Sequence, residues 1–504
     1  MSGPSGPPFL DLQSYLGFLE SVGRLRRVRP PVDKDWEIAC IARWAMESTP
    51  DEQSYAILFE QVKGYTAPVA VNLYASHSLY ASALGVAPQS LLHHWAGALS
   101  APRQPIPVET ALAQEVVETG PGASLLSIPA PVWTPGRDAG PYLSAGNVIT
   151  KDPETGVQNL GNYRIQIHDA SRVGLFFGSR MQHGAIHCAK YTQRGQPMPV
   201  AIVVGASPAV NFAAAAKTEY GVDELTIAGG LTGAGLEVTR ARTVDLWVPA
   251  RAESVLEGWV SPGAQQLEGP FGEALGYMDT AAPAAVMSIS AITHRRSPVH
   301  HGYLQQLPPS DGHLVMELGI LGPLWYYLSC KLGLRGVRDL AILRGSAGVS
   351  ALVVQLEKSA ASRAAEIGRV LAKIGFGQKF IYLVDEDLDI RDPETLNWGL
   401  STRVDPERDI TIIPETRTFQ IDPAVLAGAA AAGDPAGAPP YHSSLAVVDA
   451  TVKCAVPEIS LPPRILMNQV LTRWPEFGLP PIAPRKRLLH LLASHTEAGE
   501  VNKE

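Results

Sequence analysis

The sequence predicts a mixed α/β (α+β) fold of about three domains, and three observations carry this prediction. The chain has 504 residues, whereas a typical domain has roughly 150. Helical and strand-like hydrophobic patterns alternate in residues 1–128 and again in residues 310–504. Residues 129–309 instead carry short strand-like segments separated by turns. We therefore expect an N-terminal, a central and a C-terminal domain with these bounds.

The N-terminal domain is expected to contain two helices and two buried strands. The first helix is predicted by apolar residues at helical spacing, with Gly23 as the stop signal; these residues are Leu12, Tyr15, Leu16, Leu19 and Val22. Residues 35–47 repeat the helical pattern. Residues 55–59 and 68–73 are typical of short strands joined through a turn. The domain is therefore predicted to be α/β.

The central domain is predicted to be rich in strands. Strand patterns cover residues 147–150, 162–168, 173–177, 199–204 and 245–248. Helical patterns are sparse between them, and no G-x-G-x-x-G string joins a strand to a helix. This texture favours a barrel or a sandwich over a Rossmann unit.

In the C-terminal domain the two patterns alternate again. Helical spacing is found at residues 313–319 and 359–374, and apolar strands are found at residues 352–355 and 380–384. Such alternation is typical of an α/β domain.

Composition and charge exclude several classes of protein. Acidic residues number 49 and basic residues 41, which gives a net charge of −8, and no long Lys/Arg run is present to bind nucleic acid. No run of about 18 apolar residues is available to span a membrane, and Asp11 and Glu20 interrupt the region where a signal-peptide core would lie. The four cysteines are too widely spaced for a metal or redox pair. We expect a cytoplasmic protein that binds neither nucleic acid nor membranes.

A first group of polar residues lies on one predicted strand. Alternation places Arg164, Gln166 and His168 on one face of residues 162–168 and apolar residues on the other. A strand edge that faces water explains this pattern equally well. Asn159 has the opposite parity, so it joins Arg164 in one site only if the intervening glycine permits a bend.

A second group is suited to a metal ion. His183 and His187 are spaced to share one face of a helix, as in zinc sites, although such pairs are more often structural. Three carboxylates follow between residues 219 and 224, and clustered acids ahead of a helix are usually solvated. Together with Asn159 and His183, however, Glu224 completes an O/N/O set suited to Mn²⁺ or Mg²⁺.

Two further carboxylates, Glu268 and Glu273, flank a Gly-Pro-Phe-Gly turn. Neither a helix nor a strand places side chains at this spacing next to each other, so only a bent loop brings them together. Two acids beside an arginine supply a clamp for a carboxylate substrate and a group for proton transfer. The alternative interpretation is an ordinary surface turn.

Taken in order along the chain, these strings resemble the UbiD family of prenylated-FMN-dependent decarboxylases, which includes ferulic acid and hydroxybenzoate/aromatic acid decarboxylases. The motifs that carry the resemblance are Asn159-x4-Arg164, Gln182-His183, Gly221-Val-Asp-Glu224, Glu268-Gly-Pro-Phe-Gly-Glu273, the stretch 379–389 and the stretch 449–453. The resemblance implies a central split β-barrel related to flavin reductases and a C-terminal α/β domain used in oligomerisation.

The resemblance also implies how the cofactor is held. Asn159, His183 and Glu224 would be the ligands of Mn²⁺ (or Mg²⁺), which bridges to the phosphate of prenylated FMN, with K⁺ nearby. Gln182 and Lys379 would contact the cofactor. His187 has no counterpart in the family pattern.

The implied activity is a reversible, non-oxidative decarboxylation of an aromatic, heteroaromatic or α,β-unsaturated carboxylic acid, through a covalent adduct with the cofactor or a quinoid intermediate. Arg164 would hold the substrate carboxylate close to the cofactor, Glu268 would orient Arg164, and Glu273 would donate the proton that replaces CO₂. The implied partners are a flavin prenyltransferase that supplies the cofactor and further copies of the chain, as a homodimer or higher homo-oligomer.

Two other classes of function remain open on the residues alone. A metal-dependent hydrolase could use His183, His187 and a carboxylate, and it would lack flavin absorbance. A non-catalytic, cofactor-carrying subunit would tolerate the loss of Arg164 and Glu273.

Overall fold

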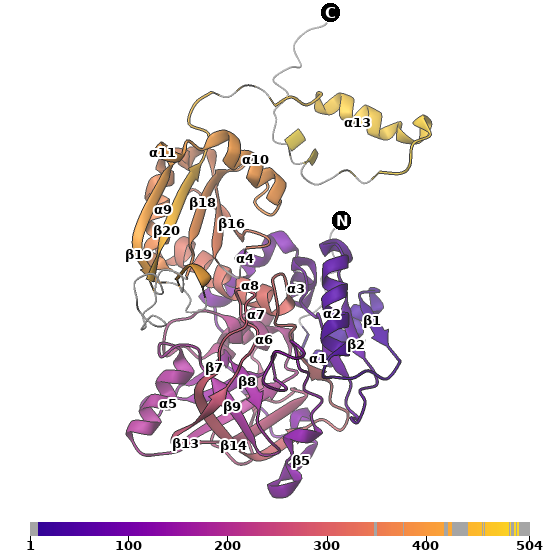
Figure 1. Ribbon diagram of the computed structural model, residues 1–504, viewed down its shortest axis with the longest axis vertical. Coiled ribbons are helices and arrows are strands. Elements are labelled where there is room, and N and C mark those ends of the chain that lie inside the picture. Colours follow the sequence, from indigo (N-terminus) through magenta and orange to yellow (C-terminus); the bar gives the residue numbers. More distant parts are fainter. Residues whose placement is uncertain are drawn as a thin grey trace, which may run out of the picture. The chain divides into compact units, whose positions relative to one another are not determined.

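The computed structural model describes residues 9–346, 350–375, 377–417, 422–425, 442–455, 457, 459–482, 484, 488–489 and 491–492. Contacts between residues divide the chain into two compact units, residues 1–333 and 334–504. The elements of each unit are labelled in Figure 1.

The first unit begins with a small mixed sheet and four helices. The strand order is β1-β2-β3-β15, in which β2 and β3 are antiparallel and the outer pairs are parallel. The strands are β1 (Leu25–Val28), β2 (Ala56–Phe59), β3 (Val69–Val71) and β15 (His300–His301). The helices are α1 (Leu12–Ser21), α2 (Glu37–Ser48), α3 (His77–Ala83) and α4 (Leu91–Ser100). The two helices and two strands predicted here are confirmed.

Helix α1 has local start and stop signals that were sufficient to predict it from its own residues. Asp11 caps its N-terminus, where a side-chain oxygen accepts the Ser14 N–H at 2.8 Å, which satisfies one of the free donors of the first turn. The chain leaves the helix at Gly23, whose φ of 70° suits glycine. The apolar residues between these two signals are buried.

The centre of the first unit is one antiparallel sheet with the strand order β7-β6-β10-β13-β14-β9-β8, and β5 pairs with β14. Its strands are β5 (Val116–Thr119), β6 (Asn147–Lys151), β7 (Gln158–Asn162), β8 (Arg164–Ile167), β9 (Arg172–Phe176), β10 (Met198–Val204), β13 (Ser254–Glu268) and β14 (Ala282–His294). Only Tyr163 separates β7 from β8, so the two ends of this order meet and the sheet curls into an open barrel (Figure 1).

Strand β8 is buried on both faces. Ile165 and Ile167 join the aliphatic cluster shared by the strands of the sheet, while Arg164 and Gln166 are 9% and 7% exposed. The interpretation of this polar face as a solvent-facing edge is therefore wrong. A buried arginine needs ionic partners, and these are described below.

The remaining elements of the first unit include a second small sheet and four helices. A three-stranded sheet has the order β12-β11-β4, formed by β4 (Ile106–Pro107), β11 (Glu237–Arg240) and β12 (Trp247–Pro249). The helices are α5 (His183–Gln193), α6 (Pro208–Ala215), α7 (Glu224–Thr232) and α8 (Asp311–Tyr326), which continues into a short π-helix (Tyr327–Lys331).

The second unit contains a five-stranded sheet with the order β16-β17-β18-β20-β19, in which β17, β18 and β20 are parallel. Its strands are β16 (Val337–Ile342), β17 (Ala351–Leu356), β18 (Phe380–Asp385), β19 (Ile410–Arg417) and β20 (His442–Ala450). Its helices are α9 (Ala364–Ile374), α10 (Pro393–Arg403), α11 (Pro406–Asp409) and α13 (Arg464–Thr472). The α/β character predicted for this region is confirmed.

Within the described ranges, no helix combines the length and apolar character that crossing a membrane requires. The four cysteines are all free thiols.

Candidate active site

A buried ion pair joins the ends of two strands. Arg164 is the first residue of β8, and Glu268 is the last residue of β13. The Nε atom of Arg164 lies 2.9 Å and 3.0 Å from the two carboxylate oxygens of Glu268, and its Nη2 atom lies 2.5 Å from Oε2. The Glu268 side chain is fully buried. Paired contacts of this kind fix the plane of the guanidinium.

The opposite end of the same guanidinium meets two more carboxylates. Arg164 Nη1 lies 2.5 Å from Glu273 Oε1 and 3.3 Å from Asp279 Oδ2. Both acids belong to the loop between β13 and β14. The expectation that a bent loop brings Glu268 and Glu273 together around an arginine agrees with this geometry. Asp279 was missed, because it lies outside any motif.

Backbone contacts hold this loop in its bent form. Gly269 has a φ of 85°, which suits glycine, and its N–H donates to Gln166 Oε1 at 3.1 Å. The Glu273 N–H donates to the Tyr277 carbonyl at 2.9 Å. A Cβ atom at Gly272 would meet the Gln305 carbonyl oxygen at 2.7 Å. The glycines thus allow the close approach that places the carboxylates.

Aromatic rings form the surroundings of the guanidinium. The ring centre of Phe176 lies 4.0 Å from Arg164 Cζ, and that of Phe271 lies 5.7 Å from it. Tyr142 stacks on Phe271 with ring centres 4.0 Å apart. Burial, and after it the charge of Glu268, raise the pKa of Tyr142 above its ordinary value, so the Tyr142 hydroxyl stays protonated.

The cluster shifts the ionisation of its members in opposite ways. Burial raises the pKa of Glu273; Arg164 acts against this shift and Asp279 adds to it. Burial alone would lower the pKa of Arg164, but the surrounding carboxylates outweigh it and raise that pKa. Arg164 therefore stays charged while Glu273 is poised to hold a proton. Its side chain is still 26% exposed, which gives it access to solvent protons.

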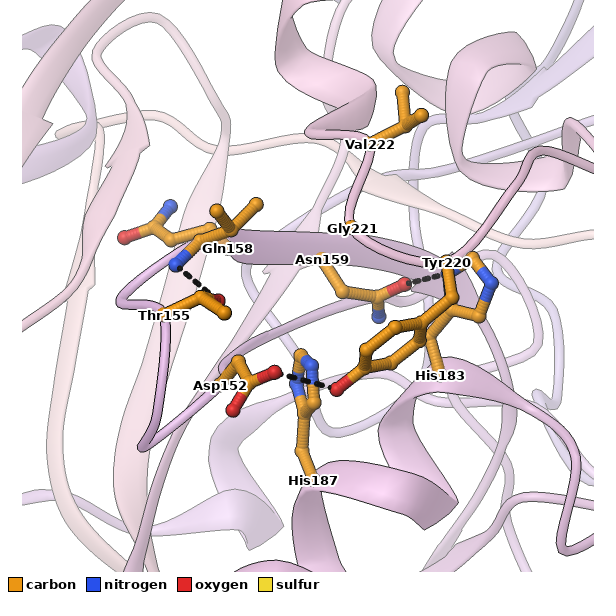
Figure 2. Close-up of a pocket in the computed structure, with 10 residues that line it drawn as sticks. Asp152, Thr155, Gln158, Asn159, His183, His187, Tyr220, Gly221 and Val222 are labelled. Carbon is orange, nitrogen blue, oxygen red and sulfur yellow. Dashed lines mark hydrogen bonds between the residues drawn. The ribbon is translucent and has the colours of Figure 1, made fainter.

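A second cluster contains Asn159, His183 and Glu224. Asn159 lies on β7, while His183 and Glu224 are the first residues of α5 and α7. His183 Nδ1 lies 3.2 Å from Asn159 Oδ1, as Figure 2 shows, and 3.7 Å from Glu224 Oε1. One nitrogen and two oxygen atoms therefore converge from three elements.

Glu224 is fixed from two sides and is 2% exposed. Its Oε2 atom accepts the Leu160 N–H at 2.8 Å, and its Oε1 atom accepts the Thr218 hydroxyl at 2.9 Å. Asp223 caps α7 by accepting the Leu225 N–H at 2.9 Å. Throughout the described part of the chain, no group of three or more His, Cys, Asp or Glu residues is arranged to hold a metal. A metal at this cluster would therefore depend on the amide of Asn159.

His187 lies one turn further along α5 and has a different environment. Its Nδ1 atom lies 2.8 Å from the Thr150 hydroxyl, and burial lowers its pKa to about 4. The ring of Tyr220 contacts both His183 and His187, and the Tyr220 hydroxyl donates to Asp152 at 2.6 Å. A small cavity is lined by Asp152, His183, His187 and Tyr220, among others (Figure 2). The hydrogen bond to Thr150 accounts for His187 as a structural residue.

Gln182 and Lys379, which were predicted to contact the cofactor, belong to different units of the chain. Gln182 precedes α5, and its backbone carbonyl accepts the Ile186 N–H at 3.0 Å. Lys379 belongs to the second unit, where its Nζ atom lies 2.9 Å from Asp422.

Tyr163 connects the two clusters and was also missed. It is the single residue between β7 and β8. Its hydroxyl accepts the Gly184 N–H at 3.1 Å and lies 3.4 Å from Asn159 Nδ2. The break in the strand at Tyr163 changes the direction of the chain, so the parity that separates Asn159 from Arg164 in an unbroken strand does not apply.

Domain families of 3-octaprenyl-4-hydroxybenzoate carboxy-lyase match three parts of the chain. The N-terminal domain matches residues 16–99, the Rift-related domain residues 106–308 and the C-terminal domain residues 323–449. An uncharacterized protein of Synechocystis sp. is 31% identical over 441 residues, which cover 82% of this chain and 86% of the relative. The chain therefore belongs to the UbiD family and is a carboxy-lyase of that type.

Solved structures give the same result. The UbiD-class enzyme HmfF from Pelotomaculum thermopropionicum, in complex with FMN, has a TM-score of 0.79 and 31% identity, covering 90% of this chain and 96% of HmfF. An evolved dimeric form of HmfF in complex with prFMN has a TM-score of 0.77 and 32% identity, covering 90% and 97%. Vanillic acid decarboxylase of Sedimentibacter hydroxybenzoicus has a TM-score of 0.79 and 26% identity, covering 93% and 99%. The predicted family, fold class and enzyme class are confirmed.

Proposed function

We propose that this carboxy-lyase reversibly decarboxylates an aromatic, heteroaromatic or α,β-unsaturated carboxylic acid, with prenylated FMN as its cofactor. The observation that carries the proposal is the Arg164 guanidinium between Glu268 and Glu273. A cation held by one buried carboxylate, next to a carboxyl group of raised pKa, is suited to bind an acid and to return a proton to carbon. The complexes of HmfF with FMN and prFMN support the choice of cofactor.

The second cluster fits the phosphate end of such a cofactor. Asn159, His183 and Glu224 offer the oxygen and nitrogen donors that Mn²⁺ or Mg²⁺ accepts. Helices α5 and α7 both begin at this cluster, and helix N-termini favour anions such as phosphate. We assign the metal to these three residues, and we assign K⁺ and Gln182 to the surroundings of the same phosphate.

Prenylated FMN, when bound, would supply an electron-poor ring that stabilises the negative charge developing on the substrate carbon. Arg164 holds the substrate carboxylate, and Glu268 keeps the guanidinium in one plane. The bond between the carboxyl group and the substrate carbon breaks, CO₂ leaves, and the electron pair stays with the substrate. Glu273 then transfers its proton to that carbon and recovers a proton from solvent. No net oxidation takes place.

The chemistry around Arg164 supports an unsaturated, planar acid. Phe176, Phe271 and Tyr142 present ring faces and edges near the clamp, and aromatic rings pack well against other π systems. The vanillic acid decarboxylase among the solved relatives acts on an aromatic acid, as its name states.

The assembly and domain roles complete the proposal. Residues 129–309 would hold the cofactor and the metal, and residues 310–504 would form the contact between copies in a homodimer or a higher homo-oligomer. A flavin prenyltransferase would supply the cofactor.

The test is to produce the chain together with a flavin prenyltransferase and to identify the released cofactor by mass spectrometry. The holoenzyme is then screened against aromatic, heteroaromatic and acrylic acids for CO₂ release and for exchange of product protons with D₂O. Arg164→Gln should abolish both reactions, and Arg172→Gln on the neighbouring strand should leave them unchanged. Verified prenylated FMN without either reaction for any acid would overturn the proposal, and a colourless protein with hydrolase activity would replace it.

A further inference from the structure

Asp279 is the third carboxylate on Arg164, and the loop holds it in place. Its backbone N–H donates to the Phe271 carbonyl at 2.8 Å, and its Oδ1 atom accepts the Thr280 N–H at 2.8 Å. Its Oδ2 atom faces Arg164 Nη1 at 3.3 Å, and the side chain is 13% exposed. Asp279 is thus directed at the same nitrogen as Glu273.

The charges at this point do not balance. One guanidinium faces the carboxyl groups of Glu268, Glu273 and Asp279, so a single positive charge opposes up to three negative ones. A substrate carboxylate on Arg164 would add a fourth. Like charges that share a site are relieved most simply when one of them takes up a proton.

Titratable groups from the neighbouring elements do not restore the balance. Burial raises the pKa of Asp138, in the turn packed against the loop, to about 6. Burial lowers the pKa of His168, at the end of β8, and lowers that of His313, on α8, to about 4. Both histidines are therefore uncharged at neutral pH, and of the groups named here Arg164 alone is a cation.

Glu273 is the carboxyl group placed to accept the proton. Glu268 is held by three contacts to Arg164, whereas Glu273 has one short contact to Nη1 and is more exposed than Asp279. Asp279 competes for the same Nη1 atom and repels a charged Glu273.

We propose that Asp279 is a positioning residue that shares Arg164 with Glu273 and keeps Glu273 protonated when a substrate carboxylate arrives. The inference rests on the proposed function, because it assumes that Glu273 delivers the proton. Its consequence is that substrate binding and proton loading are coupled. Glu273 is then already protonated when CO₂ leaves.

The experiment is an infrared pH titration of the holoenzyme, in which the carboxyl band of Glu273 is assigned by its disappearance in Glu273→Gln. In Asp279→Asn, which removes a charge and keeps the shape, the titration midpoint of Glu273 should fall by about one pH unit. Asp279→Glu restores the charge and should return the midpoint toward the wild-type value. Asp169→Asn is the matched control, since Asp169 pairs with Arg172 outside the cluster, and it should leave the midpoint unchanged.

An unchanged midpoint in Asp279→Asn overturns the role of Asp279. Asp279→Ser removes the same charge with a smaller side chain and replaces Asp279→Asn if that variant does not fold. The titration needs no turnover, so its failure is distinct from failure of the proposed function, which the screen for CO₂ release tests. In turnover, the high-pH limb of kcat/KM, which reports the holoenzyme without substrate, should move to lower pH by the same amount as the infrared midpoint.

Discussion

Arg164 and Glu268 are 104 residues apart in the chain, yet Arg164 Nη2 lies 2.5 Å from Glu268 Oε2 in a buried pair. Because both side chains are buried, water cannot solvate either charge, so removing one partner would leave the other charge uncompensated. The pair also leaves Nη1 of Arg164 directed at the loop carboxylates. Everything that we propose for catalysis depends on this orientation.

Glu268→Gln should loosen the guanidinium while keeping the size of the side chain. Because a small misplacement of a clamp is costly in rate, kcat/KM should fall on the order of 100-fold. Steady-state kinetics of the holoenzyme would measure the loss. Glu237→Gln, which weakens a surface pair with Arg251, is the control, and equal losses in the two variants would contradict the clamp.

Glu273→Gln should lower the rates of decarboxylation and of product-proton exchange with D₂O at least about 100-fold, while prenylated FMN stays bound. The glutamine has no proton of suitable acidity. In the wild type, burial raises the pKa of Glu273. A general acid works only when protonated, so activity should fall as pH rises through that raised pKa. Exchange at near wild-type rate in the loaded variant would assign the acid to another group.

His183→Ala and Glu224→Ala should purify with little flavin, because the phosphate loses the metal that compensates its charge. Treatment of the wild type with a chelator should also release the cofactor. Flavin content is read from absorbance and from the mass of the released cofactor. His187→Gln is the matched control, since His187 bonds to Thr150 instead. Normal flavin in the first two variants would remove these residues from the phosphate site.

Acidification should destabilise the first unit through its buried histidines. Burial, and after it the neighbouring His300, lower the pKa of His301 to about 3. The unfolded chain binds a proton below about pH 6.5 while the folded chain does not, so stability is lost as pH falls from there toward 3. At pH 5 the contribution is about 2 kcal/mol. His301→Phe should therefore lose less Tm than the wild type between pH 7 and pH 5, and an identical loss would show that His301 does not carry this sensitivity.

Local patterns predicted much of the fold. The first helix has a cap, an apolar stripe and a glycine stop, and β10 is a continuous apolar run, so both could be assigned from their own residues. The long strands β13 and β14 could not be assigned in this way. Residues 261–267 of β13 are mostly exposed and include a proline and a glycine, so they lack the alternation that marks a strand.

The candidate site was predictable only in part for the same reason. The types and spacing of Glu268 and Glu273 indicated a bent loop, because no regular element converges them. Asp279 reaches Arg164 through the return of that loop, which no periodic pattern records. Whether Asn159 and Arg164 serve neighbouring clusters depended on the break at Tyr163, which a tertiary contact with α5 stabilises.

Strands β7 and β8 follow each other with one residue between them, so this segment limits how far apart the two clusters lie. Asn159 and Arg164 are five positions apart, and the Cα atoms of an extended chain of that length lie at most ~17 Å apart. Under the proposed function, the cofactor phosphate lies at the Asn159 end of this segment and its ring at the Arg164 end, so a flavin without its phosphate would leave Asn159, His183 and Glu224 uncontacted. Inserting one residue beside Tyr163 would lengthen this segment and turn one cluster away from the other. The length of this short segment thus limits the separation of the two proposed binding sites.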